Sequence, residues 1–146
     1  MPEAKKRFEF LEHTADVYVA AYGSTLEEAF ENAALALFEA MTDTSKVDAK
    51  VEESVEARGV DEQELLYDWL ENLLVRFDET GNLYSRFKVE EIRKVDGEYR
   101  LKAKIWGEPF NPEKHPQRTG VKAVTYHLME IKRKPEGVVV KFLLDV

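Results

Sequence analysis

The chain has 146 residues, 44% hydrophobic and 34% charged, which predicts one globular domain over residues 1–146 with a real hydrophobic core. It contains no apolar run of about 18 residues and begins with a polar, basic stretch, so we expect no membrane span, no export signal and a cytoplasmic location. The absence of cysteine excludes disulfides, thiolate metal sites and cysteine nucleophiles. The net charge of −8 argues against wide nucleic-acid binding, but it leaves room for a local basic patch and favours a cation or a basic partner.

Two strands and a helix are predicted in the first third of the chain. Residues 8–14 alternate weakly and residues 16–22 are rich in Val and Tyr, which is typical of strands. Gly23 breaks this pattern, and Ser24 with Glu27 has the spacing of a capping box. Apolar side chains then recur at helical spacing, so we expect a helix that ends near residues 42–43.

A third strand and a second helix are predicted next. Residues 49–58 alternate apolar and acidic side chains, which indicates an exposed strand. Asp61 and Glu64 give a second capping signal. The apolar side chains from Leu66 to Phe77 follow at offsets typical of a helix, and we interpret this stripe as core rather than as a partner-binding face. Residues 80–82 end the helix.

The remaining residues favour strands. The period changes to two around residues 87–89 and 99–105, with a hairpin turn between them at residues 96–97. A loop with three prolines spans residues 107–120, and a final hairpin joins residues 121–134 to residues 138–146. The order β-β-α-β-α-β-β-β-β predicts an α+β fold, a two-layer sandwich with two helices packed on one face of a mostly antiparallel sheet.

Common catalytic motifs are absent from the sequence. It has no Gly-rich phosphate loop, no dinucleotide fingerprint, no zinc-binding H-E-x-x-H and no nucleophile elbow. The histidines His13, His115 and His127 are far apart. No local pattern therefore points to an enzyme, although a stand-alone metal-dependent hydrolase stays open as an alternative.

Carboxylates at two distant places in the chain suggest a metal site. Asp16 begins the second predicted strand, Asp145 ends the last one, and Val146 adds its α-carboxylate. If these strands are antiparallel neighbours, the three groups converge. They would then either take up protons or share a hard cation such as Ca²⁺ or Mg²⁺. The alternative is that Asp16 caps a turn and Asp145 is solvated.

Several motifs resemble those of the archease family. They cover nearly the whole chain in the family's order: His13-Thr14-Ala15-Asp16, Gly23-x-Thr25-Leu26-Glu27-Glu28-Ala29-Phe30, Phe38-x-x-Met41-Thr42-Asp43, Gly107-Glu108, Lys114-His115-Pro116, Val121-Lys122-Ala123-Val124-Thr125-Tyr126-His127 and the terminal Asp145-Val146. The combination is specific, and the fold that the resemblance implies is similar to the predicted one.

The resemblance implies a non-catalytic cofactor of tRNA splicing. Archeases assist the RtcB-type RNA ligase by promoting its guanylylation and multiple turnover, and they can broaden its use of nucleotides. The family's metal site, usually described as binding Ca²⁺, maps onto Asp16, Asp145 and Val146, with Asp43 nearby. Some members are described instead as chaperone-like modules for a tRNA methyltransferase. We expect contact with tRNA itself to be indirect or weak.

The long loop at residues 107–120 is a second candidate for partner contact. Lys114, His115 and Arg118 could meet phosphate or acidic groups there, with help from Lys122, or the loop is a solvated connection.

Three further residues have specific expectations. We expect His13 to be a turn residue that hydrogen-bonds to backbone or orients Asp16, and His127 to be a packed strand residue. Trp106 falls on the strand face opposite Leu101, Ala103 and Ile105, which suggests an exposed interface aromatic.

Overall fold

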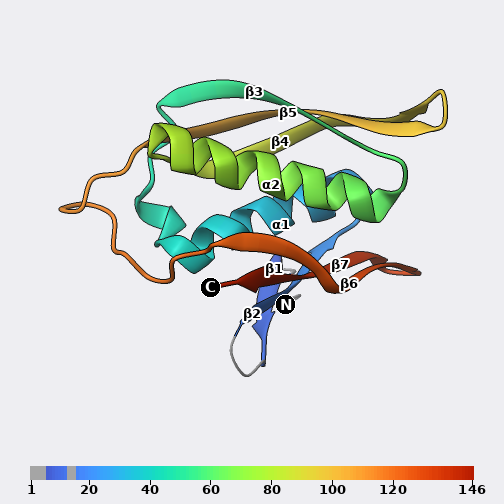
Figure 1. Ribbon diagram of the computed structural model, residues 1–146, viewed down its shortest axis with the longest axis horizontal. Coiled ribbons are helices and arrows are strands. Elements are labelled where there is room, and N and C mark those ends of the chain that lie inside the picture. The colour runs from blue at the N-terminus through green and yellow to red at the C-terminus, as the bar shows by residue number, and fades with distance from the viewer. Residues whose placement is uncertain (1–5, 13–15) are drawn as a thin grey trace, which may run out of the picture.

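The computed structural model describes residues 6–12 and 16–146, and the elements within them follow the predicted order (Figure 1). They are β1 (Phe8–Leu11), β2 (Val17–Gly23), α1 (Leu26–Met41), the short 3₁₀ helix η1 (Thr44–Lys46), β3 (Val51–Gly59), α2 (Glu62–Thr80), β4 (Asn82–Val95), β5 (Glu98–Pro109), β6 (Ala123–Lys134) and β7 (Gly137–Asp145). His13, which lies at the predicted corner between the first two strands, is outside the described residues.

The strands form two sheets, and neighbouring strands within each sheet are antiparallel. One sheet has the order β1-β2-β7-β6 and the other the order β3-β5-β4. The helices lie between the sheets, so each sheet turns one face to the helix layer (Figure 1). The α+β class with antiparallel strands is confirmed, with the strands divided between two sheets rather than gathered into one.

One hydrophobic core joins both sheets and both helices. Helix α1 contacts β2 and β4, while α2 contacts β3 and β6, so each helix reaches both sheets. The indole of Trp69 in α2 is fully buried and donates a hydrogen bond of 2.9 Å to the carbonyl of Phe30 in α1. The apolar stripe of α2 is therefore core, as predicted. Neither described helix has the length and apolar character needed to cross a membrane.

The helix ends follow the capping signals closely. The Asp61 carboxylate accepts the Glu64 N–H at 2.8 Å, and Gly81, with φ 75°, ends α2 in the left-handed conformation that glycine favours. At α1 the capping residue is Thr25, one residue later than predicted. Its hydroxyl accepts the N–H of Glu28, whose carboxylate accepts the N–H of Ser24.

Strand β6 contains a large bulge that the sequence does not predict. Thr125 pairs with Leu143 and Glu130 with Lys141, so residues 126–129 all lie opposite Phe142. Within the bulge Leu128 has φ 60°, which strains a bulky side chain. His127 lies in this bulge and is exposed, so the prediction that it packs as a strand residue is wrong.

Candidate functional site

Strand pairing brings the two acidic side chains predicted for the metal site, Asp16 and Asp145, to the same end of one sheet. β2 and β7 are antiparallel neighbours with Val17 opposite Leu144, so Asp16, just before Val17, lies beside Asp145, just after Leu144. On its other side, β7 is held by β6: Ala123 pairs with Asp145, whose carbonyl accepts the Lys122 N–H at 2.8 Å. The strand adjacency on which the predicted metal site depends is therefore present.

The surroundings of Asp16 include charged groups from two other segments. Asp16 lines a pocket of about 300 Å³ together with Glu39, near the end of α1, and Arg118, from the long loop. Arg118 donates to the Glu39 carboxylate at 2.8 Å and to its carbonyl at 3.1 Å. Sequence reasoning missed Glu39; its only signal is an acidic side chain beside the apolar positions of the last turns of α1.

The donor chemistry at this end of the sheet fits a hard cation. Asp16, Asp145 and the Val146 carboxylate offer oxygen atoms alone, which Ca²⁺ and Mg²⁺ prefer. Across residues 6–12 and 16–146, no three His, Cys, Asp or Glu side chains gather closely enough to hold a metal ion. The predicted set has only two such side chains and takes its third ligand from the chain terminus, so it stays a prediction.

Asp43 has a capping role. Its carboxylate accepts the N–H of Ser45 at 3.1 Å and the hydroxyl of Ser45 at 2.6 Å, at the start of η1. These hydrogen bonds, helped by the charge of Arg118, lower the pKa of Asp43. Asp43 is therefore the cap of η1, the short helix that follows α1.

A buried ionic cluster anchors the long loop. Glu108 is 5% exposed, and one of its carboxylate oxygens accepts the Asp48 N–H at 2.9 Å and contacts Lys114 at 2.7 Å and His115 at 2.9 Å. Burial alone would raise the pKa of Glu108, but the hydrogen bonds from Asp48, Lys114 and His115 outweigh it and lower the pKa to about 2. Glu108 is thus a structural anion.

His115 belongs to this cluster as a neutral ring. It is 1% exposed, and its Nδ1 accepts the Asn111 N–H at 2.9 Å. A ring nitrogen that accepts a hydrogen bond has no proton, so the proton lies on Nε2, which donates to Glu108. His115 is therefore closed to an external phosphate.

Two of the other loop cations form ion pairs within the chain, although Arg118 stays exposed, and contact of the loop with a partner stays a prediction. Lys114 pairs with Asp48 and Glu108, and Arg118 pairs with Glu39. The N–H groups of Arg118 and Thr119 each donate at 3.0 Å to the last carbonyls of α1. Strand β5 also continues to Pro109, so the loop begins later than predicted. The loop is therefore held against the body of the protein, and its backbone N–H groups satisfy carbonyl groups at the C-terminal end of α1 that have no partner within the helix.

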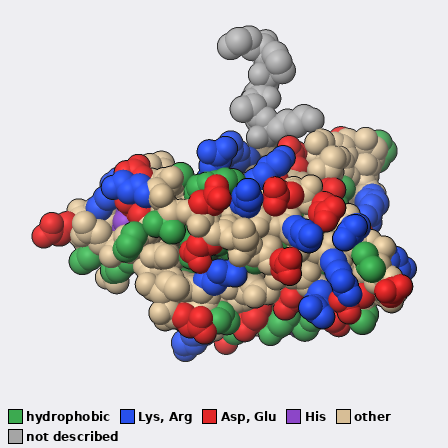
Figure 2. All heavy atoms as spheres, turned by 90° about the horizontal axis from the view of Figure 1, so that it is seen from above, with side chains coloured by type: hydrophobic (Ala, Val, Ile, Leu, Met, Phe, Trp, Pro, Cys, Tyr) green, Lys and Arg blue, Asp and Glu red, His purple; other side chains and the backbone are tan. Residues whose placement is uncertain are grey.

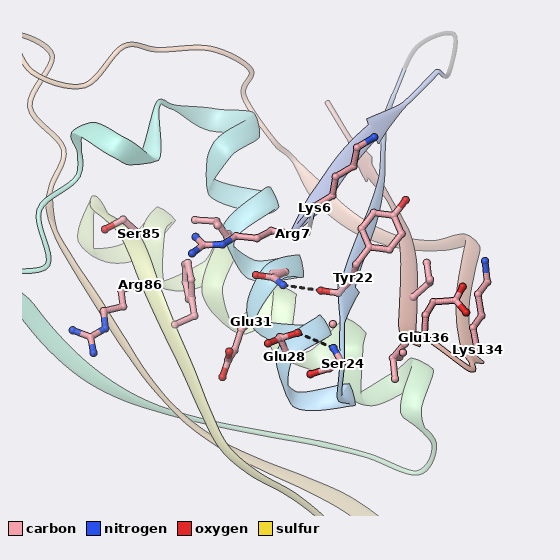
Figure 3. Close-up of a pocket in the computed structure, with 17 residues that line it drawn as sticks. Lys6, Arg7, Tyr22, Ser24, Glu28, Glu31, Ser85, Arg86, Lys134 and Glu136 are labelled. Atoms are coloured by element: carbon pink, nitrogen blue, oxygen red, sulfur yellow. Dashed lines mark hydrogen bonds between the residues drawn. The ribbon is translucent and has the colours of Figure 1, made fainter. Parts of the chain in front are cut away.

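A larger pocket of about 730 Å³ lies beside the first turns of α1 (Figure 3). The Ser24 N–H and the Asn32 side chain make hydrogen bonds there, to Glu28 and to the carbonyl of Tyr22. Its walls mix basic and acidic side chains, and none of the residues predicted for the metal site lines it. Its size therefore adds nothing to the case for the metal site.

Fold and strand order define an α+β protein with a helix layer between two antiparallel sheets, and comparison with known proteins gives its family. Residues 8–146 match the model of the Archease protein family (MTH1598/TM1083). The chain is 51% identical over 141 residues to Protein archease of Sulfolobus acidocaldarius, covering 96% of this chain and 99% of that one. It is 44% identical over 146 residues to Protein archease of Methanosarcina mazei, covering all of both chains.

Two solved structures agree with this result. The solution structure of protein 1598 of Methanobacterium thermoautotrophicum is similar with a TM-score of 0.85 and 46% identity, over 96% of this chain and 99% of that one. The crystal structure of an archease of Thermotoga maritima, described as a possible chaperone, has a TM-score of 0.59 and 20% identity over all of both chains, a likeness of fold alone. The chain belongs to the archease family.

Proposed function

We propose that this protein is a non-catalytic activator of an RtcB-type tRNA-splicing ligase in the cytoplasm. It promotes guanylylation and multiple turnover of the ligase and broadens the nucleotides that the ligase uses. The observation that supports this most is the pairing of β2 with β7, which sets Asp16 and Asp145 at the same end of one sheet in a chain of the archease family.

In this proposal the three carboxylates hold Ca²⁺ or another hard divalent cation at the end of the sheet. A cation presented to the ligase's nucleotide site would neutralise phosphate charge and help to orient the triphosphate, which are the main sources of catalysis in such transfers. The ligase supplies the nucleophile. In this proposal, residues of this chain support the ligands: the Lys122 N–H donates to the backbone carbonyl of Asp145, and the Arg118–Glu39 pair lines the pocket beside Asp16.

The direct test replaces each acidic ligand by its amide. Asp16→Asn and Asp145→Asn keep side-chain shape but remove a charged ligand, so each should lower ligase guanylylation at least about tenfold, as expected when a metal ligand is lost. Multiple-turnover joining of broken tRNA with GTP measures this effect. Calorimetric titration should show that both variants bind Ca²⁺ more weakly than the unaltered protein. A chain extended beyond Val146 should also bind Ca²⁺ more weakly, because the extension moves the terminal carboxylate away from the site.

The matched control is Asp78→Asn, an exposed acid on α2 that lines neither pocket described above. It should activate the ligase like the unaltered protein, and all variants should keep the same circular dichroism spectrum. Full activation by both ligand variants would refute the proposal.

A second candidate is a chaperone-like role towards a tRNA methyltransferase. It is favoured by the apolar side chains that the β6 bulge exposes: Tyr126 is 51% exposed and Leu128 is 45% exposed. Light scattering of a heated methyltransferase separates the two roles. Suppression that disappears in Tyr126→Ser but persists in Asp16→Asn would support this second role.

A further inference from the structure

The outer face of the β3-β5-β4 sheet concentrates positive charge in an acidic protein. Leu101, Ala103 and Ile105 point into the core, so the residues between and after them point outward. We call the following set the basic face: Arg86 and Lys88 of β4, with Lys102, Lys104 and Trp106 of β5. Figure 2 views the molecule from this side and shows Lys and Arg side chains gathered over its right half, with acids among them.

The cations of the basic face are available for an outside anion. Register places Lys88 directly opposite Lys104 and Arg86 opposite Trp106. Neighbouring arginines on this sheet are already paired, Arg58 and Arg100 with Glu98 and Arg93 with Glu91. Arg86, Lys88, Lys102 and Lys104, all within the described strands, make no ion pair or side-chain hydrogen bond. Like charges set side by side cost free energy, which a bound polyanion would recover.

Trp106 and Arg86 form an ordered stacking platform beside these lysines. The indole Nε1 donates to the Glu52 carboxylate at 3.0 Å, which fixes the orientation of the ring. The Arg86 guanidinium carbon lies 4.7 Å from the ring centroid, so cation and ring stack. Aromatic rings and guanidinium planes are the surfaces on which unpaired bases stack.

We propose that the basic face binds a single-stranded nucleic acid, with phosphates on Lys88, Lys102 and Lys104 and a base stacked on the Arg86–Trp106 pair. A protein partner would need an apolar interface core, and the described strands of this face offer only Trp106 and the partly buried Val95. Glu52, Glu56 and Glu91 lie among the cations, which limits the contact to a few nucleotides. The inference does not depend on the proposed function, because binding is measured without a ligase.

The test uses fluorescence anisotropy of a fluorescein-labelled oligoadenylate about twelve nucleotides long, titrated with the full chain from low to moderate salt. Lys88→Gln with Lys104→Gln should weaken binding about tenfold at low salt and reduce the slope of log affinity against log salt by about 1.4, since two phosphate contacts are lost and each accounts for about 0.7. Arg86→Lys keeps the charge but loses the planar stack, so it should weaken binding about fivefold with little change in slope.

The matched control is Lys46→Gln with Lys134→Gln, which removes the same charge from two exposed lysines outside the basic face. It should change the affinity less than twofold. The proposal is overturned if the unaltered protein does not bind the oligonucleotide, or if the control weakens binding as much as the Lys88 and Lys104 pair does. The proposal is also overturned if oligoglutamate displaces the labelled oligoadenylate as well as unlabelled oligoadenylate does and Arg86→Lys leaves the affinity unchanged. That result would point to an acidic protein as the partner instead.

Discussion

Glu108 illustrates how a single buried charge can hold a long loop. Its carboxylate joins the N–H of Asp48, shortly before β3, to Lys114 and His115 in the loop. A buried carboxylate with several donors is stable only while it is ionised, because the protonated form loses most of these interactions. The position of the loop is therefore linked to pH.

The linkage has a definite sign. The pKa of Glu108 is lowered from 4.5 to about 2 in the folded protein, so its stabilising contribution is complete above pH 4.5 and is lost as the pH falls towards 2. Glu108→Gln should lower the free energy of unfolding by roughly 3 kcal/mol at pH 7. The deficit should shrink between pH 4.5 and pH 3, as measured by urea unfolding at each pH.

Glu113→Gln is the control for this change, since Glu113 lies in the same loop with its side chain exposed. It should have little effect at any pH. A deficit for Glu108→Gln that stays constant from pH 7 to pH 3 would contradict the role given to the ionised carboxylate.

At the scale of elements, the bulge in β6 is held by contacts from two neighbours. The Tyr18 hydroxyl of β2 donates to the Leu128 carbonyl at 2.8 Å, and the ring of Tyr126 stacks on Tyr67 of α2 with centroids 4.4 Å apart. These contacts keep Leu128 at a positive φ that its side chain disfavours.

Relieving this strain should stabilise the protein. Leu128→Gly and Leu128→Ala both remove the half-exposed side chain, but only glycine accepts φ 60° without steric cost. We expect the glycine variant to be more stable than the alanine variant by about 1 kcal/mol, measured by chemical denaturation. Equal stabilities would show that the bulge relaxes away from this conformation.

The sequence predicts local structure better than partners in space. Asp61 with Glu64 marks the start of α2 correctly, because the capping pattern there is unique. Before α1, Ser24 with Glu27 and Thr25 with Glu28 overlap, and spacing alone cannot choose between them. Alternation shows which side chains share a face but not which strand lies alongside, so the division into two sheets is not predictable from it.

In the candidate site, too, the sequence predicts some features and not others. Asp16 and Asp145 could be predicted as neighbours because each lies at the end of a strand. The burial of His115 and the pairing of Arg118 with Glu39 depend on how the loop folds over α1, and no periodic pattern encodes that path. The bulge at Leu128 could not be predicted, since leucine disfavours the conformation it adopts.

On the scale of the whole molecule, the shared core predicts cooperative unfolding. Side chains from both sheets pack on the same two helices, so neither sheet retains a complete core without the other. In Trp106→Phe, the buried Trp69 between the helices becomes the single tryptophan. Its fluorescence and the far-ultraviolet circular dichroism should change at the same urea midpoint. Two separate midpoints would show that the sheets unfold independently.

The place of β7 inside its sheet has a consequence for biosynthesis. This strand lies between β2 and β6, and its partner β2 is made more than a hundred residues earlier. While the ribosome is still adding residues 137–145, β2 keeps one hydrogen-bonding edge open, and unpaired edges of this kind invite aggregation. Such distant pairing is also slow to form. More than a hundred residues are thus made after β2 before the strand appears that completes this sheet and carries Asp145 of the proposed metal site.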